Sequence, residues 1–497
     1  MVLTPVQEPQ QEPEKEPETA RLWPPPATVP SAATLVGVPL AGLVGAVVLV
    51  VSRAGVGWLL TGLVVAAVAT ATAWGAGRRR PTLPEAGWGC AALALLAMGT
   101  LRAGWLFAFC AIGALLAGSL ALAGGRTTRG LALGMGAGVV AAFRGIPWAS
   151  AGLAYARSRR RPEGGPRIGL SVFVAVLLVL VFGALFASAD AVFAKLTAGL
   201  LPPVDGPGLV KAVLRGGLVL AIALGCAFLA ARRPGFDDVP ATRPRLVRRV
   251  EWVLPLAALD ALFLVFVLVQ VTVLVGGGYG RLDYARYARS GFFQLVVITV
   301  LTLVVLGVAA RVAPREQRTD RLLLRGLLGT LAVLTLVIVA SALTRMARYE
   351  QEYGWTRLRV LVGAVELWLG LLFVLVLVAG VRLRAGWLPR AVAGTAVAGL
   401  LAVTLLNPDR FIADRNVDRY LRTGDIDVAV LEDLSADAAP AFDRLPAQLR
   451  SCALSWLAED LAAHPDDWRT WNLGRAQARA VIARGPRPDS RDCNQRS

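Results

Sequence analysis

The sequence predicts an all-α, polytopic membrane protein with a small helical domain at its C-terminal end. Hydrophobic residues make up 56% of the 497 residues, and the mean hydropathy is +0.59, whereas soluble proteins are about 45–50% apolar. Long apolar runs recur along most of the chain, and arginines gather in short clusters between them. The pattern favours one large membrane domain with appendages over the roughly three soluble domains that the length alone suggests.

The N-terminal segment, residues 1–33, is an acidic tail rich in Pro, Glu and Gln. Such a composition cannot bury a core, so we expect the tail to be disordered. The flank of the first apolar run is acidic rather than basic, which argues against a signal peptide.

About eleven transmembrane helices are expected, because a helix needs roughly 20 residues to cross a bilayer. In chain order they are 34–51, 56–75, 87–101, 103–124, 168–188, 209–231, 252–276, 291–311, 322–343, 359–381 and 386–406. We group them as N-terminal helices, 34–124, and a core, 168–406. Between the groups lies a basic segment, 125–167, whose short apolar run 131–143 predicts an interfacial or re-entrant element. If that run crossed the membrane, the topology after it would be inverted.

The arginine clusters predict the orientation of the chain. With a cytoplasmic N-terminus, the cytoplasmic loops hold most of the loop arginines, as the positive-inside rule requires. These loops are 76–86, 125–167, 232–251, 312–321 and 382–385. The C-terminal domain, 407–497, is then extracytoplasmic. A bias towards Ala, Gly, Val, Leu and Arg suggests a bacterial source, so we expect a multi-pass protein of the bacterial inner membrane whose partner is the lipid bilayer.

Composition also restricts the chemistry. The net charge of +18 would suit nucleic acid, but its arginines lie between apolar runs, so we expect no nucleic-acid partner. The chain has one histidine, His464, and no CxxC, HExxH, GxSxG or Walker A sequence. We therefore expect no metal, no cofactor and no assigned catalytic residue, and an enzyme is the less favoured reading.

The C-terminal domain is expected to contain helices near 409–422, 427–434, 446–463 and 466–484. Asn407 followed by Pro408 is a helix-start signal, with Asn as the N-cap and Pro at the first helical position. Asp466 and Asp467 suit the first turn of the last helix. Cys452 and Cys493 could form a disulfide if the domain is extracytoplasmic, although free thiols are nearly as compatible with the sequence.

Four polar, aromatic-rich stretches fall on the predicted outer face: 186–195, 281–295, 344–359 and 407–420. We expect them to form a polar surface. Its candidate residues are Asp190, Asp283, Tyr287, Arg345, Arg348, Tyr349, Glu352, Asp414, Arg415, Asn416 and Tyr420. One interpretation is packing between the loops and the C-terminal domain, since such residues gather at membrane boundaries. The other is a pocket in which Arg345, Arg348 and Arg415 bind a small anionic ligand, because a guanidinium group donates two parallel hydrogen bonds.

Three polar residues lie inside apolar runs: Asp260, Gln270 and Glu366. Ionisable groups at this depth usually face a bundle interior and have a partner. Transport or proton relay is one hypothesis, and a structural Arg or hydroxyl partner is the other.

Five motifs in order carry a family resemblance: FASADAVFAKL, YARYARSGFFQL, ALTRMARYEQEYGWTRLR, NPDRFIADRNVDRY and WNLGRAQAR. They resemble a bacterial polytopic membrane family known as a domain of unknown function, number 4173 and close to 4153. The resemblance covers about residues 165–484 and implies an integral membrane protein without an assigned activity.

Three functions are compatible with these features. The favoured one is envelope sensing, assembly or partner binding, in which the outer polar surface contacts envelope proteins. A transporter of a small anionic or lipid-like solute would use Asp260 or Glu366. A transferase acting on lipid-linked substrates at the outer leaflet would need carboxylates that converge there, and the short first outer loop, 52–55, argues against it.

Overall fold

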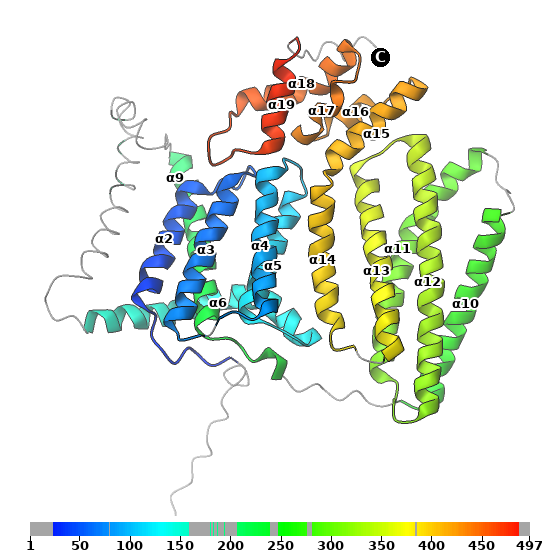
Figure 1. Cartoon of the computed structure of the whole chain (residues 1–497), viewed down its shortest axis with the longest axis horizontal. Coiled ribbons are helices and arrows are strands. Elements are labelled where there is room, and N and C mark those ends of the chain that lie inside the picture. The colour runs from blue at the N-terminus through cyan, green and yellow to red at the C-terminus, as the bar shows by residue number, and fades with distance from the viewer. Residues whose placement is uncertain are drawn as a thin grey trace, which may run out of the picture. The chain divides into compact units, whose positions relative to one another are not determined.

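The computed structural model is helical, and no β-strand occurs among the residues that it describes (Figure 1). These are residues 23–78, 80–158, 206–238, 247–275, 281–382 and 385–486, with four isolated positions between 179 and 193. The membrane-region helices are α2 (Ala32–Val48), α3 (Val56–Gly75), α4 (Leu83–Leu101), α5 (Phe107–Ala123), α6 (Thr128–Ser158), α9 (Gly206–Ala231), α10 (Arg249–Val275), α11 (Arg281–Val312), α12 (Arg318–Tyr353), α13 (Arg357–Arg382) and α14 (Leu388–Leu405). The all-α fold class is confirmed.

Ten of the eleven expected spans coincide with these helices, and the remaining one, 168–188, lies outside the described residues. Within the described chain, eight helices are long and apolar enough to cross a membrane, namely α3, α6 and α9 to α14. The helices α2 and α5 are apolar but have only 17 residues each. A multi-pass membrane protein is therefore supported, while the count of eleven stays a prediction.

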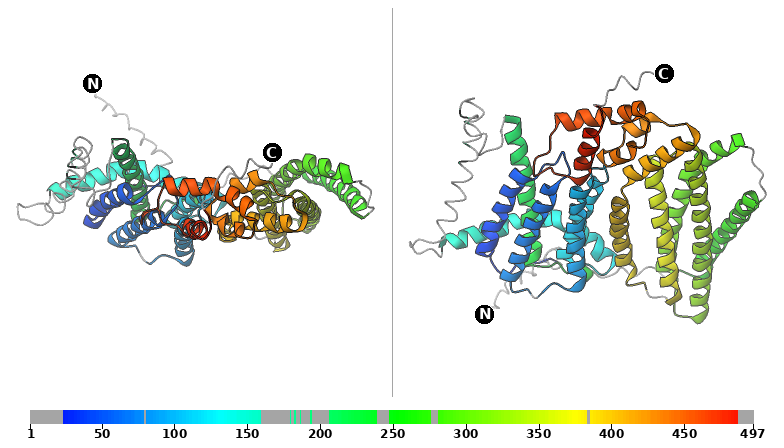
Figure 2. Two further views of the ribbon diagram at one scale, coloured as in Figure 1. Left: turned by 90° about the horizontal axis from the view of Figure 1, so that it is seen from above. Right: turned by 45° about the horizontal axis from the view of Figure 1, so that its top comes forward.

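The basic segment differs most from expectation. In place of a short element at 131–143, α6 is a continuous helix of 31 residues with Pro147 inside it. It packs against α9 through glycines: a Cβ atom on Gly225 would lie 2.6 Å from the carbonyl oxygen of Gly138. The two helices cross rather than run side by side, and the views in Figures 1 and 2 agree on this.

Contacts divide the chain into two compact units. The first comprises Met1–Ala46, Val64–Ala86 and Ser119–Pro240, and the second comprises Val47–Leu63, Gly87–Gly118 and Ala241–Ser497. In the first unit, three of its loops meet. Arg233 pairs with Glu85 at 2.6 Å, Arg78 donates to the carbonyl oxygens of Leu229 and Ala230, and Asp237 accepts from the backbone N–H of Arg126 and Thr127. All three loops belong to the face predicted to be cytoplasmic.

The end of the expected disordered tail also belongs to this unit. Trp23 is only 4% exposed and packs against Phe228 and Phe236, while Arg144 lies 4.9 Å from its ring centroid. Trp23 and Pro30 bury apolar surface that composition alone does not reveal, so residues 23–33 pack against this unit, while the tail boundary itself stays a prediction. Residues 1–22 lie outside the described residues.

In the second unit, α12 packs against α10, α11 and α13. Their shared core includes Leu331, Ile338 and Phe373. At one end of this bundle, Arg249 donates to Asp320 and to Gln317, both at 2.6 Å. These residues come from two loops predicted to be cytoplasmic.

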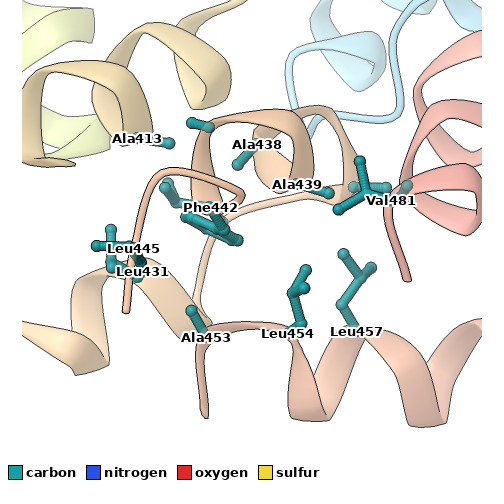
Figure 3. Packing of buried hydrophobic residues seen from close by; sticks show 14 of the residues in the cluster. Ala413, Leu431, Ala438, Ala439, Phe442, Leu445, Ala453, Leu454, Leu457 and Val481 are labelled. Atoms are coloured by element: carbon teal, nitrogen blue, oxygen red, sulfur yellow. The ribbon is translucent and has the colours of Figure 1, made fainter. Parts of the chain in front are cut away.

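The C-terminal domain belongs to the same unit. Its helices are α15 (Pro408–Thr423), α16 (Val428–Glu432), η2 (Ala436–Ala438), α17 (Ala439–Phe442), α18 (Ala447–Ala463) and α19 (Leu473–Ala483). Figure 3 shows Phe442 at the centre of their core, among Leu431, Leu454, Leu457 and Val481.

The last helix starts later than the sequence predicts. Residues 464–472 form a loop, and α19 begins at Leu473 with Asn472 as its N-cap. Asp466 and Asp467 therefore do not lie in a first helical turn. Their carboxylates bind arginines instead. The sequence rule that places acidic residues in a first helical turn considers only the helix dipole and not such ion pairs.

Candidate functional site

The candidate site is the junction at which the C-terminal domain meets the helix ends of its own unit. Asn407 begins it with a left-handed conformation, φ 57°, and its side chain accepts a hydrogen bond from the backbone N–H of Arg410. Pro408 occupies the first helical position of α15, and Gly424, with φ 75°, ends that helix. The predicted N-cap is confirmed, and it fixes the direction in which the chain leaves α14.

An ion pair holds α15 to the start of α13. Arg357 donates through Nε and Nη2 to the two carboxylate oxygens of Asp409, both at 2.8 Å, and through Nη1 to Asp433 at 3.0 Å. The Asp409 side chain is only 3% exposed, and it also accepts from the backbone N–H of Ser435. A two-point guanidinium–carboxylate pair fixes orientation as well as distance.

A second contact joins α15 to the connection between α12 and α13. The side chain of Asn416 accepts from the N–H of Trp355 and donates to its carbonyl oxygen, both at 2.9 Å. Gly354, with φ 77°, ends α12 and brings the backbone close: a Cβ atom there would lie 2.8 Å from Asn416 Oδ1. Trp355 also packs edge-on against Phe411. Asn416 therefore fixes α15 to this connection by bonding to both backbone groups of Trp355.

A third contact involves the connection between α4 and α5. Asp437 Oδ2 accepts from the N–H of Ala103 at 2.7 Å, and Arg102 donates to the carbonyl oxygen of Leu405 at 2.7 Å. Asp437 is buried, and its Oδ1 has no hydrogen-bond partner among the described residues. Burial raises the pKa of Asp437 to about 6, and the charge of Asp409 adds to the rise, while the Ala103 N–H and the Arg102 charge oppose it.

A small pocket lies between these contacts. Its lining residues are Arg102, Gly104, Trp105, Leu106, Thr404, Asn407, Pro408, Asp409 and Asp437. Its enclosed volume of about 10 Å³ is close to the minimum for one water molecule. The C-terminal domain therefore packs against the helix ends at this junction with room for about one water molecule between them.

The raised pKa of Asp437 predicts that the stability of the C-terminal domain depends on pH. Because its native pKa of about 6 exceeds the ordinary 3.8, the folded domain binds this proton more tightly than the unfolded chain does. The stability contribution of Asp437 is thus highest below about pH 4 and falls as the pH rises towards 6. In Asp437→Asn, the amide oxygen still accepts from Ala103. We expect the variant to exceed wild type in unfolding free energy by about 2–3 kcal/mol above pH 6.5, and by almost nothing near pH 4.

Thermal unfolding of the two proteins between pH 4 and 7.5 measures this difference. Asp427→Asn is the control, because Asp427 is exposed and its side chain makes no capping hydrogen bond. Its difference from wild type is expected to stay flat. A difference for Asp437→Asn that does not change with pH would contradict the assignment.

The loop 464–472 makes a fourth contact, with the connection between α2 and α3. In that connection, Arg53 pairs with Asp460 at 2.9 Å and with Asp466 at 3.8 Å. Asp466 also accepts from Arg475 and Arg479 within the domain. The N–H of Val56 donates to the carbonyl oxygen of Trp471. These residues were missing from the predicted surface, because Arg53 and Val56 lie more than 400 positions from their partners in the domain. The motif WNLGRAQAR, which contains Arg475 and Arg479, was the available signal.

The same contact has a buried amide. Asn472 caps α19 by accepting from the N–H of Arg475, and its amide group donates to the carbonyl oxygen of Gly99 at 2.7 Å. One side chain therefore accepts from a backbone N–H at the start of α19 and donates to a backbone carbonyl near the end of α4.

The arginines proposed to bind an anion have separate environments. Arg345 donates to Oε1 of Gln270 at 2.7 Å, so a predicted outer residue meets a predicted intramembrane one. Arg415 lies 5.2 Å from the ring centroid of Phe411, and Arg348 is exposed. A shared anion pocket stays a prediction.

The remaining candidates are dispersed. Tyr349 is buried, stacks on Tyr353, and lies beneath the guanidinium group of Arg359. Glu352 is exposed and Tyr420 packs partly against the domain core. Asp414 pairs with Arg444 at 2.9 Å and with Arg410 at 3.6 Å. Asp190 and Cys493 lie outside the described residues, as do the side chains of Asp283 and Tyr287.

Cysteine chemistry and metal binding are limited. Cys452 is disulfide-bonded, whereas Cys90, Cys110 and Cys226 are free thiols. In the described part of the chain, no group of three or more His, Cys, Asp or Glu residues is arranged to hold a metal ion.

A comparison with protein families gives one match. Residues 88–445 match the family described as Domain of unknown function (DUF4153). The chain belongs to this DUF4153 family. The match includes three of the four docking contacts, those of Arg357, Asn416 and Asp437, and it ends before α18 and α19. It starts earlier and ends earlier than the resemblance in the sequence. No curated protein and no solved structure matches the chain.

Proposed function

We propose that this DUF4153 protein lies in the bacterial inner membrane with a cytoplasmic N-terminus and an extracytoplasmic C-terminal domain. Four connections bond to that domain and must share its side: 49–55, 102–106, 354–356 and 406–407. These are the connections that the arginine distribution places outside. The disulfide at Cys452 supports the same side, because disulfides persist in oxidising compartments.

The number of membrane crossings between α5 and the end of α12 restricts which segments can span. The chain leaves the outer side through α5 and returns to it at the end of α12, so it must cross an even number of times between them. The helices α5, α9, α10, α11 and α12 account for an odd number of crossings. Only one of α6 and the apolar run 168–188 can therefore span. Because α6 crosses α9 (Figure 2), we assign α6 to the cytoplasmic interface and the span to 168–188.

Cysteine labelling tests this topology. In a chain with Cys90, Cys110 and Cys226 replaced by alanine, Gly485→Cys is expected to react with a membrane-impermeant maleimide in intact cells. The matched variant Gly386→Cys, in the loop between α13 and α14, is expected to react only after lysis. The reverse pattern would overturn the orientation.

For the activity, we propose that the outer domain couples an envelope partner to the membrane helices, in sensing or assembly. The proposal rests on one observation: three polar residues of the family motifs hold the domain to helix ends. They are Arg357, Asp409 and Asn416. The helix α12 then runs unbroken for 36 residues, from Asp320 and its partner Arg249 to Gly354 beside Asn416. A displacement of the domain would reach the opposite membrane face through a rigid element.

Photo-cross-linking in cells tests this activity. A cross-linking residue at Trp456, 61% exposed on α18, is expected to give a discrete protein adduct. The control is Leu367, 62% exposed on the membrane helix α13, where only lipid is expected to react. Absence of any protein adduct at Trp456 and at the exposed Leu421 and Trp468 would count against partner binding. The buried carboxylate of Glu366 supports the second candidate, a transporter.

A further inference from the structure

Glu366 is the most deeply buried ionisable group among the described residues of the second unit. Its exposed fraction is 0%, and neither carboxylate oxygen has a hydrogen-bond partner among the described residues. Elsewhere in this unit, buried carboxylates such as Asp409 and Asp466 are held by arginines. An ionised carboxylate with no partner at membrane depth costs several kcal/mol or more, so this geometry holds the neutral acid.

Helix geometry places Glu366 inside the bundle. It lies nine positions from the start of α13, or about 14 Å along the axis, and so approaches the middle of the span. Gly370 and Phe373, one and two turns later, share its face of the helix. Gly370 packs against Val339 of α12, and Phe373 belongs to the core shared by α10, α11 and α12. Glu366 therefore faces other helices.

The groups on the neighbouring helices limit its partners. On α12 the charged residues towards the outer end are Arg345, Arg348, Glu350 and Glu352, of which Arg345 binds Gln270 of α10. On α11, the hydroxyl groups of Thr299 and Thr302 bond to carbonyl oxygens of their own helix.

The other two neighbours carry little charge in their apolar parts. On α14, Thr395 accepts from Trp368, and Arg390 lies near the opposite end of the bundle. Asp260 is the ionisable residue in the apolar part of α10, and it lies in the half nearer the predicted cytoplasmic side.

Arg345 is the cation at the right depth. From the contact between Gly370 and Val339, Arg345 lies six positions towards the outer end and Glu366 four. At 1.5 Å per residue the two differ by only about 3 Å along the helix axes. An arginine side chain is longer than this difference in depth.

We propose that Glu366 is a proton-binding site of the α10–α13 bundle and that Arg345 is its counter-ion in the deprotonated state. With the proton bound, Glu366 is neutral and Arg345 binds Gln270, as in this structure. When the O–H bond breaks, the proton leaves to water and the electron pair stays on the carboxylate. Arg345 then exchanges Gln270 for Glu366. The ligand is therefore the proton. The two pairings of Arg345, with Gln270 and with Glu366, provide the two states that a transporter or a sensor of outside pH requires.

A hydrophobic carbodiimide tests the site, because it reacts with protonated carboxyl groups in apolar surroundings. The acid adds across one C=N bond and the product rearranges to an N-acylurea, so no atom is lost and mass spectrometry locates it. In the full chain in liposomes, Glu366 is expected to be modified at pH 6 and at least tenfold less at pH 9. Glu366→Gln is expected to lose this adduct, and a water-soluble carbodiimide is expected to leave Glu366 unmodified.

The counter-ion gives a second readout. In Arg345→Gln, the carboxylate loses its partner, so modification of Glu366 is expected to persist at pH 9. Arg345→Lys keeps the charge and is expected to restore the decline with pH. Each variant is first shown to elute from size exclusion as wild type does. Modification that is independent of pH in wild type, or absent at every pH, would overturn the proposal; neither result depends on the envelope partner.

Discussion

Replacing Arg357 with alanine is expected to release the C-terminal domain from the membrane helices. The change leaves the Asp409 carboxylate buried, and within the described part of the chain only the Ser435 N–H remains as its partner. Removing one member of a buried ion pair costs about 3–5 kcal/mol, because the other charge stays desolvated. A protease added to the outer side should then cut near the α14–α15 junction, where wild type resists.

Two variants make this result specific. Arg410→Ala removes a pair whose atoms are 3.6 Å apart and whose side chains are both about 40% exposed, so it should cost less than about 1 kcal/mol. Arg357→Lys keeps the charge but not the two-point geometry, and should be intermediate. Equal protease resistance of Arg357→Ala and wild type would show that the pair does not hold the domain.

The helices could be predicted because each depends on a local pattern. An apolar run long enough to cross a bilayer is visible in the sequence, and so is the Asn407–Pro408 start of α15. The helix that includes 131–143 is longer than its apolar run: hydropathy falls after Phe143, but Ala, Leu and Arg favour helix, and α6 continues to Ser158. Hydropathy reports burial or membrane depth, whereas helix length depends on backbone propensity.

The partners of the polar residues could not be predicted. The sequence places Asn416 and the stretch 344–359 on the same side, but not Asn416 against the backbone of Trp355. Asp437 and Asn472 were not candidates at all, although both contact the α4–α5 region. Their partners lie more than 300 positions away, and no periodicity along the chain encodes such a separation. Intramembrane depth predicted Glu366 as unusual, yet only packing reveals that its carboxylate oxygens have no hydrogen-bond partner in the part of the chain that the structure describes.

Replacing Phe442 with alanine is expected to unfold the C-terminal domain. The ring is 2% exposed at the centre of the domain core (Figure 3). Truncating such a side chain costs about 3–5 kcal/mol, from lost burial and from the cavity left behind. For a domain of this size that is a large part of its stability. The unfolding transition of the domain, followed by near-UV circular dichroism, should shift to lower temperature or disappear.

Trp456→Ala is the matched control, because it removes a larger aromatic group from the exposed side of α18 and should change stability by no more than about 0.5 kcal/mol. An equal loss for both variants would place the core elsewhere. The position of Phe442 also bears on the family boundary. The DUF4153 match ends at 445, but Leu454, Leu457 and Val481, which belong to the same core, come from α18 and α19 beyond it. A chain ending at Leu445 should therefore lose this core at least as completely as Phe442→Ala does, since it keeps the ring and removes these members of the core.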